Sequence, residues 1–168
     1  MTTTEISSRS LSTAIILNLF RQNLQAAVTA GDITDPAATR RGTTGAPMVQ
    51  GEFPDRNPMY PHIIVQEASD AADRPDSRVD LWEHRYAVNI EIRAKSATTM
   101  YKVRDQVRGW VEEHVGTLNA AGFTDPQISP GISLNWDDQE QVRRWAFTVT
   151  GTVYTKYEPP EEPPEGEE

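Results

Sequence analysis

Three histidines, His62, His84 and His114, are the residues best suited to acid–base or metal chemistry in this chain. His62 and His84 are expected on neighbouring strands, where Glu67 or Glu83 could complete a two-histidine metal site. Their spacing matches no diagnostic ligand motif, so structural positions at strand edges are the favoured interpretation. His114 falls on or near the apolar stripe of a predicted helix, which favours a partly buried structural histidine over a general base.

Acidic residues gather in two polar segments that could hold a cation or perform acid–base work. The first segment lacks the spacing and the glycine of an EF-hand loop, so solvated acids are the favoured interpretation of Asp70, Asp73, Asp76 and Asp80. The second forms a predicted turn and offers a carboxylate pair among Asp137, Asp138 and Glu140. Exposed turn acids are favoured there too, because nothing apolar nearby would raise a pKa.

Nucleophile and phosphate motifs are missing from the sequence. No serine has a nucleophile-elbow context, and no glycine loop has phosphate-cradle spacing. The doublets Arg40-Arg41 and Arg143-Arg144 could contact nucleic acid, but no broad basic patch supports them, so salt bridges between subunits are favoured. Cysteine is absent, which excludes disulfides and thiolate chemistry. We therefore expect no enzyme activity, no cofactor and no bound metal.

Length and charge indicate one acidic domain with tails. The 168 residues include 25 acidic and 16 basic side chains, giving a formal net charge of −9. Scarce lysine and abundant threonine are typical of halophilic organisms, although an acidic protein from a GC-rich genome fits equally well. No apolar run is long enough to cross a membrane, and no signal-peptide core is present, so no membrane partner is expected.

Hydrophobic periodicity predicts the elements that must position these residues. Helical spacing of apolar residues predicts one helix over 10–31 and a second that begins near Ser96 and ends near Gly116 or Gly122. Alternation with a period of two predicts strands over 59–68, 84–95, 131–136 and 142–157. The predicted fold class is α+β, in the order α-β-β-α-β-β. One mainly antiparallel four-stranded sheet should carry two helices packed on one face.

The other face of this sheet is predicted to be polar and to meet water, a lumen or a partner. Residues 10–157 should form a single domain with a long loop at 32–58. Residues 1–9 are expected to be a flexible N-terminus, and 158–168 a disordered acidic Pro/Glu tail. Trp82 and Tyr60 border predicted loops and are the best aromatic interface anchors. The full set of interface candidates is Arg40, Arg41, Phe53, Tyr60, Trp82, Arg93, Asp137, Asp138, Arg143 and Arg144.

This layout resembles the tail terminator, or tail completion, proteins of long-tailed phages and archaeal tailed viruses. The resemblance covers roughly 11–157. It comprises an amphipathic helix, a long loop, a strand opening with Tyr60-Pro61-His62-Ile63-Ile64-Val65, a long strand entering a helix, and a last strand ending in aromatics. It is one of layout rather than of invariant residues. The long loop and the acidic proline tail depart from the family pattern.

The resemblance implies a structural virion protein of the tail or neck, assembled in the host cytoplasm. A homo-oligomeric ring, usually a hexamer, would cap the tail tube and contact the tail tube protein and a head-completion or neck protein. The genome would pass through its channel without specific binding. The polar sheet face or the Asp137-Asp138 hairpin would then face the lumen, and the loop 32–58 would reach a neighbouring subunit or ring.

Two alternatives stay open at this point. The first keeps the class and changes the position, to another head–tail joining neck protein. The second is a small α+β ligand-binding protein or enzyme of the host cell, which would need a concave pocket with convergent polar groups.

Overall fold

The computed structural model describes residues 13–52, 58–73, 81–137 and 141–156. Their helices and strands follow one another along the chain as α1 (Thr13–Ala30), α2 (Ala38–Thr44), β1 (Val49–Gln50), β2 (His62–Asp73), β3 (Leu81–Ala94), α3 (Ala97–Glu113), α4 (Val115–Ala120), β4 (Thr124–Ile128), β5 (Ile132–Asp137) and β6 (Val142–Lys156). None of the described helices is long and apolar enough to span a lipid bilayer.

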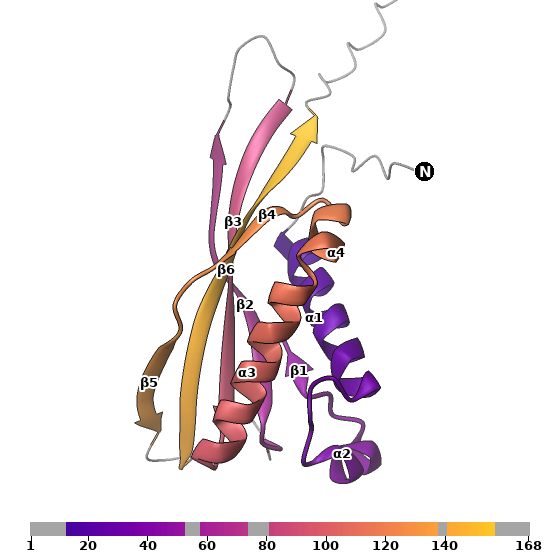
Figure 1. The fold of residues 1–168 in the computed structure, drawn as a ribbon, viewed down its shortest axis with the longest axis vertical. Coiled ribbons are helices and arrows are strands. Elements are labelled where there is room, and N and C mark those ends of the chain that lie inside the picture. The colour runs from indigo at the N-terminus through magenta and orange to yellow at the C-terminus, as the bar shows by residue number, and fades with distance from the viewer. Residues whose placement is uncertain (1–12, 53–57, 74–80, 138–140, 157–168) are drawn as a thin grey trace, which may run out of the picture.

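One six-stranded mixed sheet forms the centre of the molecule (Figure 1). Its strands lie in the order β1-β2-β3-β6-β4, and β5 pairs with β6 on the same side as β4. β1 is parallel to β2, and every other pairing is antiparallel. The longest ladder joins β3 to β6, from Leu81 opposite Lys156 to Ala94 opposite Arg143. This ladder makes the sheet elongated and places β6 inside it.

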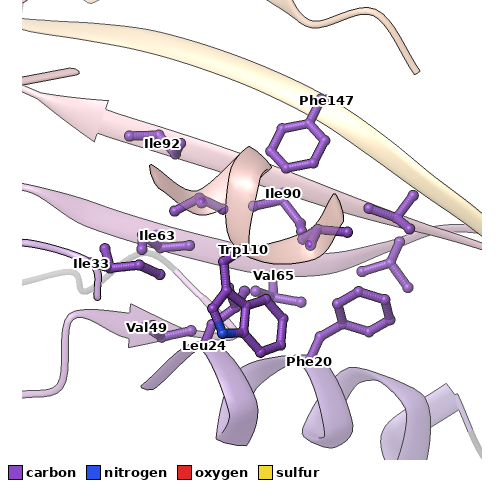
Figure 2. Packing of buried hydrophobic residues seen from close by; sticks show 14 of the residues in the cluster. Phe20, Leu24, Ile33, Val49, Ile63, Val65, Ile90, Ile92, Trp110 and Phe147 are labelled. Atoms are coloured by element: carbon purple, nitrogen blue, oxygen red, sulfur yellow. The ribbon is translucent and has the colours of Figure 1, made fainter. Parts of the chain in front are cut away.

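Helices α1 and α3 cover one face of the sheet, which we call the inner face. α1 contacts β1 and β2, whereas α3 contacts β3 and β6. Figure 2 shows inward-pointing strand residues packed against Phe20 and Leu24 of α1 and Trp110 of α3. Phe20 also meets Phe123 edge-on, with ring centroids 5.3 Å apart. Burying each large apolar side chain stabilises the fold by about 1.5–3 kcal/mol.

The ends of the two long helices follow ordinary capping chemistry. Ser96 precedes α3, and its hydroxyl oxygen accepts a hydrogen bond from the Thr99 amide at 3.1 Å. α1 ends before Gly31, whose φ of +90° turns the chain back toward the sheet. The amide of Asp32 then donates to the Ala27 carbonyl at 3.0 Å. These signals are local, which is why the sequence predicts both helices well.

The predicted α+β class is confirmed, as are both long helices and their placement on one face. The prediction of a four-stranded sheet is wrong, because β1 and β4 add two strands and β1 makes the sheet mixed. β1 has only two residues and shows no period. β4 contains Pro126 and Asp125, and the Asp125 φ of +50° is typical of a turn. The short helix α2 was not predicted, and the predicted second helix is divided into α3 and α4 at His114.

Two predicted loops contain regular structure. The segment 32–58 carries α2 and β1, with Ile33 and Met48 fully buried. β2 continues to Asp73 although a loop was predicted from Ser69, because a register shift between Glu67 and Ser69 interrupts the alternation. The predicted flexible N-terminus and the acidic Pro/Glu tail lie outside the described residues.

Gly131 separates β4 from β5 and lets the chain pass directly over a tryptophan. A Cβ atom at this position would lie 1.6 Å from the Trp145 ring, so no other residue fits without displacing that side chain. The contact explains why two short strands can follow each other along one edge of β6.

Candidate interaction surface

Arg41, a predicted interface residue, lies inside the domain with 5% of its surface exposed. Its Nε donates to the Asp35 carboxylate at 2.7 Å, and its Nη2 donates to the carbonyls of Met59 and Pro61. Burial lowers the pKa of Arg41, and Asp35 opposes that change. Through these hydrogen bonds, Arg41 links α2 to the residues that precede β2.

Over the residues that the structure describes, the loop predicted at 32–58 therefore packs against its own domain. Val49 is buried, and its amide donates to the Gln25 side chain of α1 at 3.1 Å. Met48 accepts from the Ile63 amide at 2.9 Å. Phe53, another interface candidate, lies outside the described residues.

Arg93 and Arg144, also interface candidates, join two strands within the sheet. Both Nε atoms donate to the same Glu91 oxygen, each at 2.7 Å. Burial would raise the pKa of Glu91, but hydrogen bonds from Arg144 and Arg93 outweigh it and hold that pKa below its usual value. The same contact raises the pKa of Arg144. We call Glu91, Arg93 and Arg144 the outer triad.

The outer triad lies on the face of the sheet opposite the helices, which we call the outer face. Side chains alternate along a strand, and Ile63 points inward, so Ile64 points outward, opposite Glu91. Ile64, Ala87 and Ala146 are buried there. The face predicted as polar is thus partly apolar, with Ile64 and Ala146 on the strands beside Glu91 and Ala87 opposite Thr150.

His62 also lies on the outer face and is only 1% exposed. Burial lowers its pKa to about 4, and the charges of Arg41 and Arg93 act in the same direction. The Tyr60 ring meets the imidazole edge-on at 5.5 Å between centroids. The histidine is therefore neutral at physiological pH.

The conceivable two-histidine metal site is excluded by the strand register. His62 pairs with Arg93, whereas His84 pairs with Ala72, ten residues farther along β2. That separation is about 33 Å at the usual rise of a strand. In the described ranges, no three His, Asp or Glu side chains lie close enough to share an ion.

His114 follows α3 and is half-buried, as predicted for a structural histidine. Its ring stacks on Trp110 with 4.3 Å between centroids. Its Nδ1 lies 2.8 Å from the Trp110 carbonyl oxygen.

Strand β5 presents large apolar side chains at an edge of the sheet. Ile132 is 60% exposed and Trp136 is 45% exposed. Within the described part of the chain, β5 pairs only with β6, so its outer edge carries no strand. The Arg143 guanidinium lies over the Trp136 ring at 5.4 Å, which brings one interface candidate to this edge.

The remaining candidates fall in different places. Asp137 ends β5 and pairs with Val142, while Asp138 lies outside the described residues. Trp82 lies on β3 opposite Thr155, and its side chain is not among those described. Arg40 and Tyr60, twenty residues apart in sequence, line one hollow with Lys95.

This hollow has a volume of about 660 Å³ and opens where α2 and the beginnings of β2 and α3 meet, at the lower end of Figure 1. We call it the basic hollow, because it is lined by Arg40 and Lys95 and no acidic residue is among the described residues around it. The Lys95 Nζ lies 5.8 Å from the centroid of the Tyr60 ring. Prolines and polar residues complete the lining, chiefly Pro36, Pro58, Pro61, Ser96 and Thr99. Sequence reasoning missed Lys95, which simply ends a predicted strand.

No protein-family model matches this chain, and no curated protein matches it in sequence. Among solved structures, a chain from the "Virion of native gene transfer agent (GTA) particle" is similar, with 15% sequence identity and a TM-score of 0.34. The alignment covers 78% of this chain and 94% of that chain, so it is long although the superposition is loose.

Proposed function

We propose that this protein is a structural virion protein, a tail terminator whose copies form a ring on the end of the tail tube. The ring would join the tube to a neck protein and leave a channel for the genome, and the protein would carry out no catalysis. The layout of helices and strands resembles that family. The surface chemistry of the domain supports an assembly role.

The observation that carries the proposal is the exposed apolar edge at β5. An edge strand offers free backbone donors and acceptors, and soluble proteins usually protect such strands with charge, proline or a covering segment. Beside that edge, Ile132 instead exposes 60% of its surface and Trp136 exposes 45%. Exposed apolar groups next to open backbone groups favour association with another chain.

A second edge on the opposite side of the sheet provides the surface that a ring needs. β1 pairs only with Ile63 and Ile64 of β2, and Arg21 donates to the Val65 carbonyl at 2.9 and 3.2 Å. From residue 66 onward, β2 has no strand on that side within the described residues. Two different edges on one subunit allow a head-to-tail contact, and such contacts close into a ring when the rotation per subunit permits.

The experiment is to measure the mass of the purified protein by light scattering and to image it by negative stain, at low and high salt. We expect a closed ring of about six subunits. Ile132→Lys combined with Trp136→Lys should abolish the ring, because two charges would be desolvated at the contact. Tyr101→Lys, on α3 and 48% exposed, is the matched control and should leave the ring intact. A protein that stays monomeric even with tail tubes present would contradict the proposal.

A further inference from the structure

The basic hollow has the chemistry of a binding site for an acidic, proline-rich peptide. Arg40 and Lys95 are exposed cations that can pair with carboxylates. Tyr60 lines the same hollow beside Lys95, and it offers the flat ring against which proline-rich peptides pack. Among the described residues that line the hollow, no acidic side chain offsets the charges of Arg40 and Lys95.

The sequence contains one segment with the complementary composition. Residues 158–168 read EPPEEPPEGEE, with six glutamates, four prolines and no basic residue. Alternating pairs of proline and glutamate would bring rings to Tyr60 and carboxylates to the two cations. The other acidic segments of the chain lack the paired prolines.

The geometry of the sheet prevents the paired prolines of this segment from reaching the hollow of their own subunit. Lys156 lies opposite Leu81, at the upper end of β3, while Lys95 follows the lower end of the same strand. The 14 residues between Leu81 and Lys95 correspond to about 46 Å at the usual rise of a strand. Glu168 lies 12 residues after Lys156, which spans only about 37 Å in a polyproline conformation. Pro164, the last of the prolines, lies eight residues after Lys156 and reaches at most about 29 Å even when the chain is fully extended, so the paired prolines cannot contact Tyr60 of their own subunit.

We propose that the basic hollow binds the acidic proline segment, residues 158–168, of a second copy of this chain. This inference deepens the assembly role proposed above and rests on it for the presence of neighbouring copies. The contact would link the upper end of one subunit to the lower end of the next. Because it depends on charge, it would weaken as salt is raised.

A peptide-binding experiment tests the recognition itself. The probe is a fluorescein-labelled peptide of residues 157–168, measured by anisotropy against a full-length host whose six tail glutamates are replaced by glutamine, so that the host's own segment does not compete. We expect binding that weakens at least tenfold with Arg40→Glu and Lys95→Glu together. Lys102→Glu, an exposed lysine on α3, makes the same type of charge change and should leave binding unchanged. Circular dichroism verifies that each host is folded, and Lys95→Gln replaces Lys95→Glu if folding fails.

A crosslinking experiment tests whether the contact joins two copies. Unlabelled and heavy-isotope-labelled full-length proteins are mixed and treated with a carbodiimide, which joins a lysine amine to a carboxylate. The chain has lysines only at positions 95, 102 and 156, so crosslinks are readily assigned. We expect Lys95 joined to glutamates of 158–168 in mixed-isotope pairs, and loss of that product with Lys95→Arg.

The outcomes of these two experiments test the peptide contact separately from the formation of a ring. Equal peptide binding by the double variant and the Lys102→Glu control would overturn it, as would crosslinks confined to single copies. A six-subunit ring that forms without any Lys95 crosslink would also overturn it, while leaving the proposed function intact. Peptide binding without a ring would uphold the recognition and count against the proposed function.

Discussion

The inner and outer faces of the central sheet bury their side chains by different means. On the inner face, Ile90 and Val149 are fully buried beneath α1 and α3. On the outer face, Glu91 lies between two arginines, next to buried His62 and Ile64. Hydrophobic burial stabilises the first face at any moderate pH, whereas the second depends on which groups carry charge. The stability of the outer face should therefore change with pH and salt, while that of the inner face should not.

The largest expected effect is on the inner face. Phe147→Ala should lower the free energy of unfolding by about 3–5 kcal/mol, because it removes a fully buried aromatic ring and leaves a cavity. Phe147 is 2% exposed and packs on Trp145 with 5.4 Å between ring centroids. Urea denaturation measures the change. Thr148→Ala, whose side chain points to the other face, is the control; a loss below 1 kcal/mol for Phe147→Ala would contradict this account of the inner face.

The contribution of the outer face to stability should depend on pH through His62. Folding lowers the pKa of His62 from 6.5 to about 4, so the imidazole is neutral in both the folded and the unfolded chain above pH 6.5. As the pH falls from 6.5 to 4, the unfolded chain binds the proton first, and the folded state loses stability. The full loss is about 3 kcal/mol, since each pKa unit corresponds to about 1.4 kcal/mol. Unfolding free energies between pH 7 and 4 at constant salt measure it. His62→Gln should remove this slope, and His114→Gln should retain it.

Removal of Glu91 should have a smaller effect. Glu91→Ala leaves Arg93 and Arg144 without their common partner, and we expect a loss of about 2 kcal/mol. The value is below that of a fully buried pair because the arginine side chains are 16% and 30% exposed. Urea denaturation at pH 7 measures the loss. Replacing all three residues with leucine should restore most of the stability, and failure to do so would mean that the triad does more than neutralise its own charges.

Glu91 also makes the stability depend on pH, but it does so by losing its charge on protonation, whereas His62 gains one. Folding lowers the pKa of Glu91, so its contribution is complete above about 4.5, its usual value, and is lost as the pH falls through the lower value of the folded state. Titration of the unfolding free energy should therefore show two adjoining windows, the His62 change between about pH 6.5 and 4 and the Glu91 change as the pH falls below about 4.5. Glu91→Gln should flatten only the lower one.

The smallest effect is expected where the outer face meets water. Thr150→Ala should change the unfolding free energy by no more than about 0.5 kcal/mol, because Thr150 is exposed and its hydroxyl lies a long 3.5 Å from the Gln127 carbonyl. Val149→Ala, one residue away on the inner face, should cost several times more. Thermal unfolding of the pair measures the contrast, and similar losses would erase the distinction between the faces.

The inner face could be predicted because its signals are local and periodic. Met100, Val103 and Val107 repeat at helical spacing, and Val88 and Ile90 alternate along β3, so each element reveals its own buried side. The edges of the sheet could not be predicted in this way. β1 is too short to show a period, and β4 carries turn residues.

The outer face and the hollow depend on contacts between distant segments. Arg41 looks like a surface arginine until Asp35 and the carbonyls before β2 surround it. Glu91 alternates as an exposed residue, and only the register with Arg144 of β6 shows why it is buried. The basic hollow is lined by residues of α2, of the segment 58–61 before β2, and of the turn from β3 into α3, so no single stretch of sequence could reveal it.

The position of β6 inside the sheet has a consequence for synthesis on the ribosome. β3 pairs with β6 over residues 49 to 75 positions apart, and β6 is the last of the described strands along the chain. At the usual 5–20 residues per second, the 62 residues between Ala94 and Lys156 take about 3–12 s to translate. Throughout that interval the edge of β3 that later pairs with β6 stays unpaired. Newly made chains on neighbouring ribosomes must be kept apart until translation has passed Lys156.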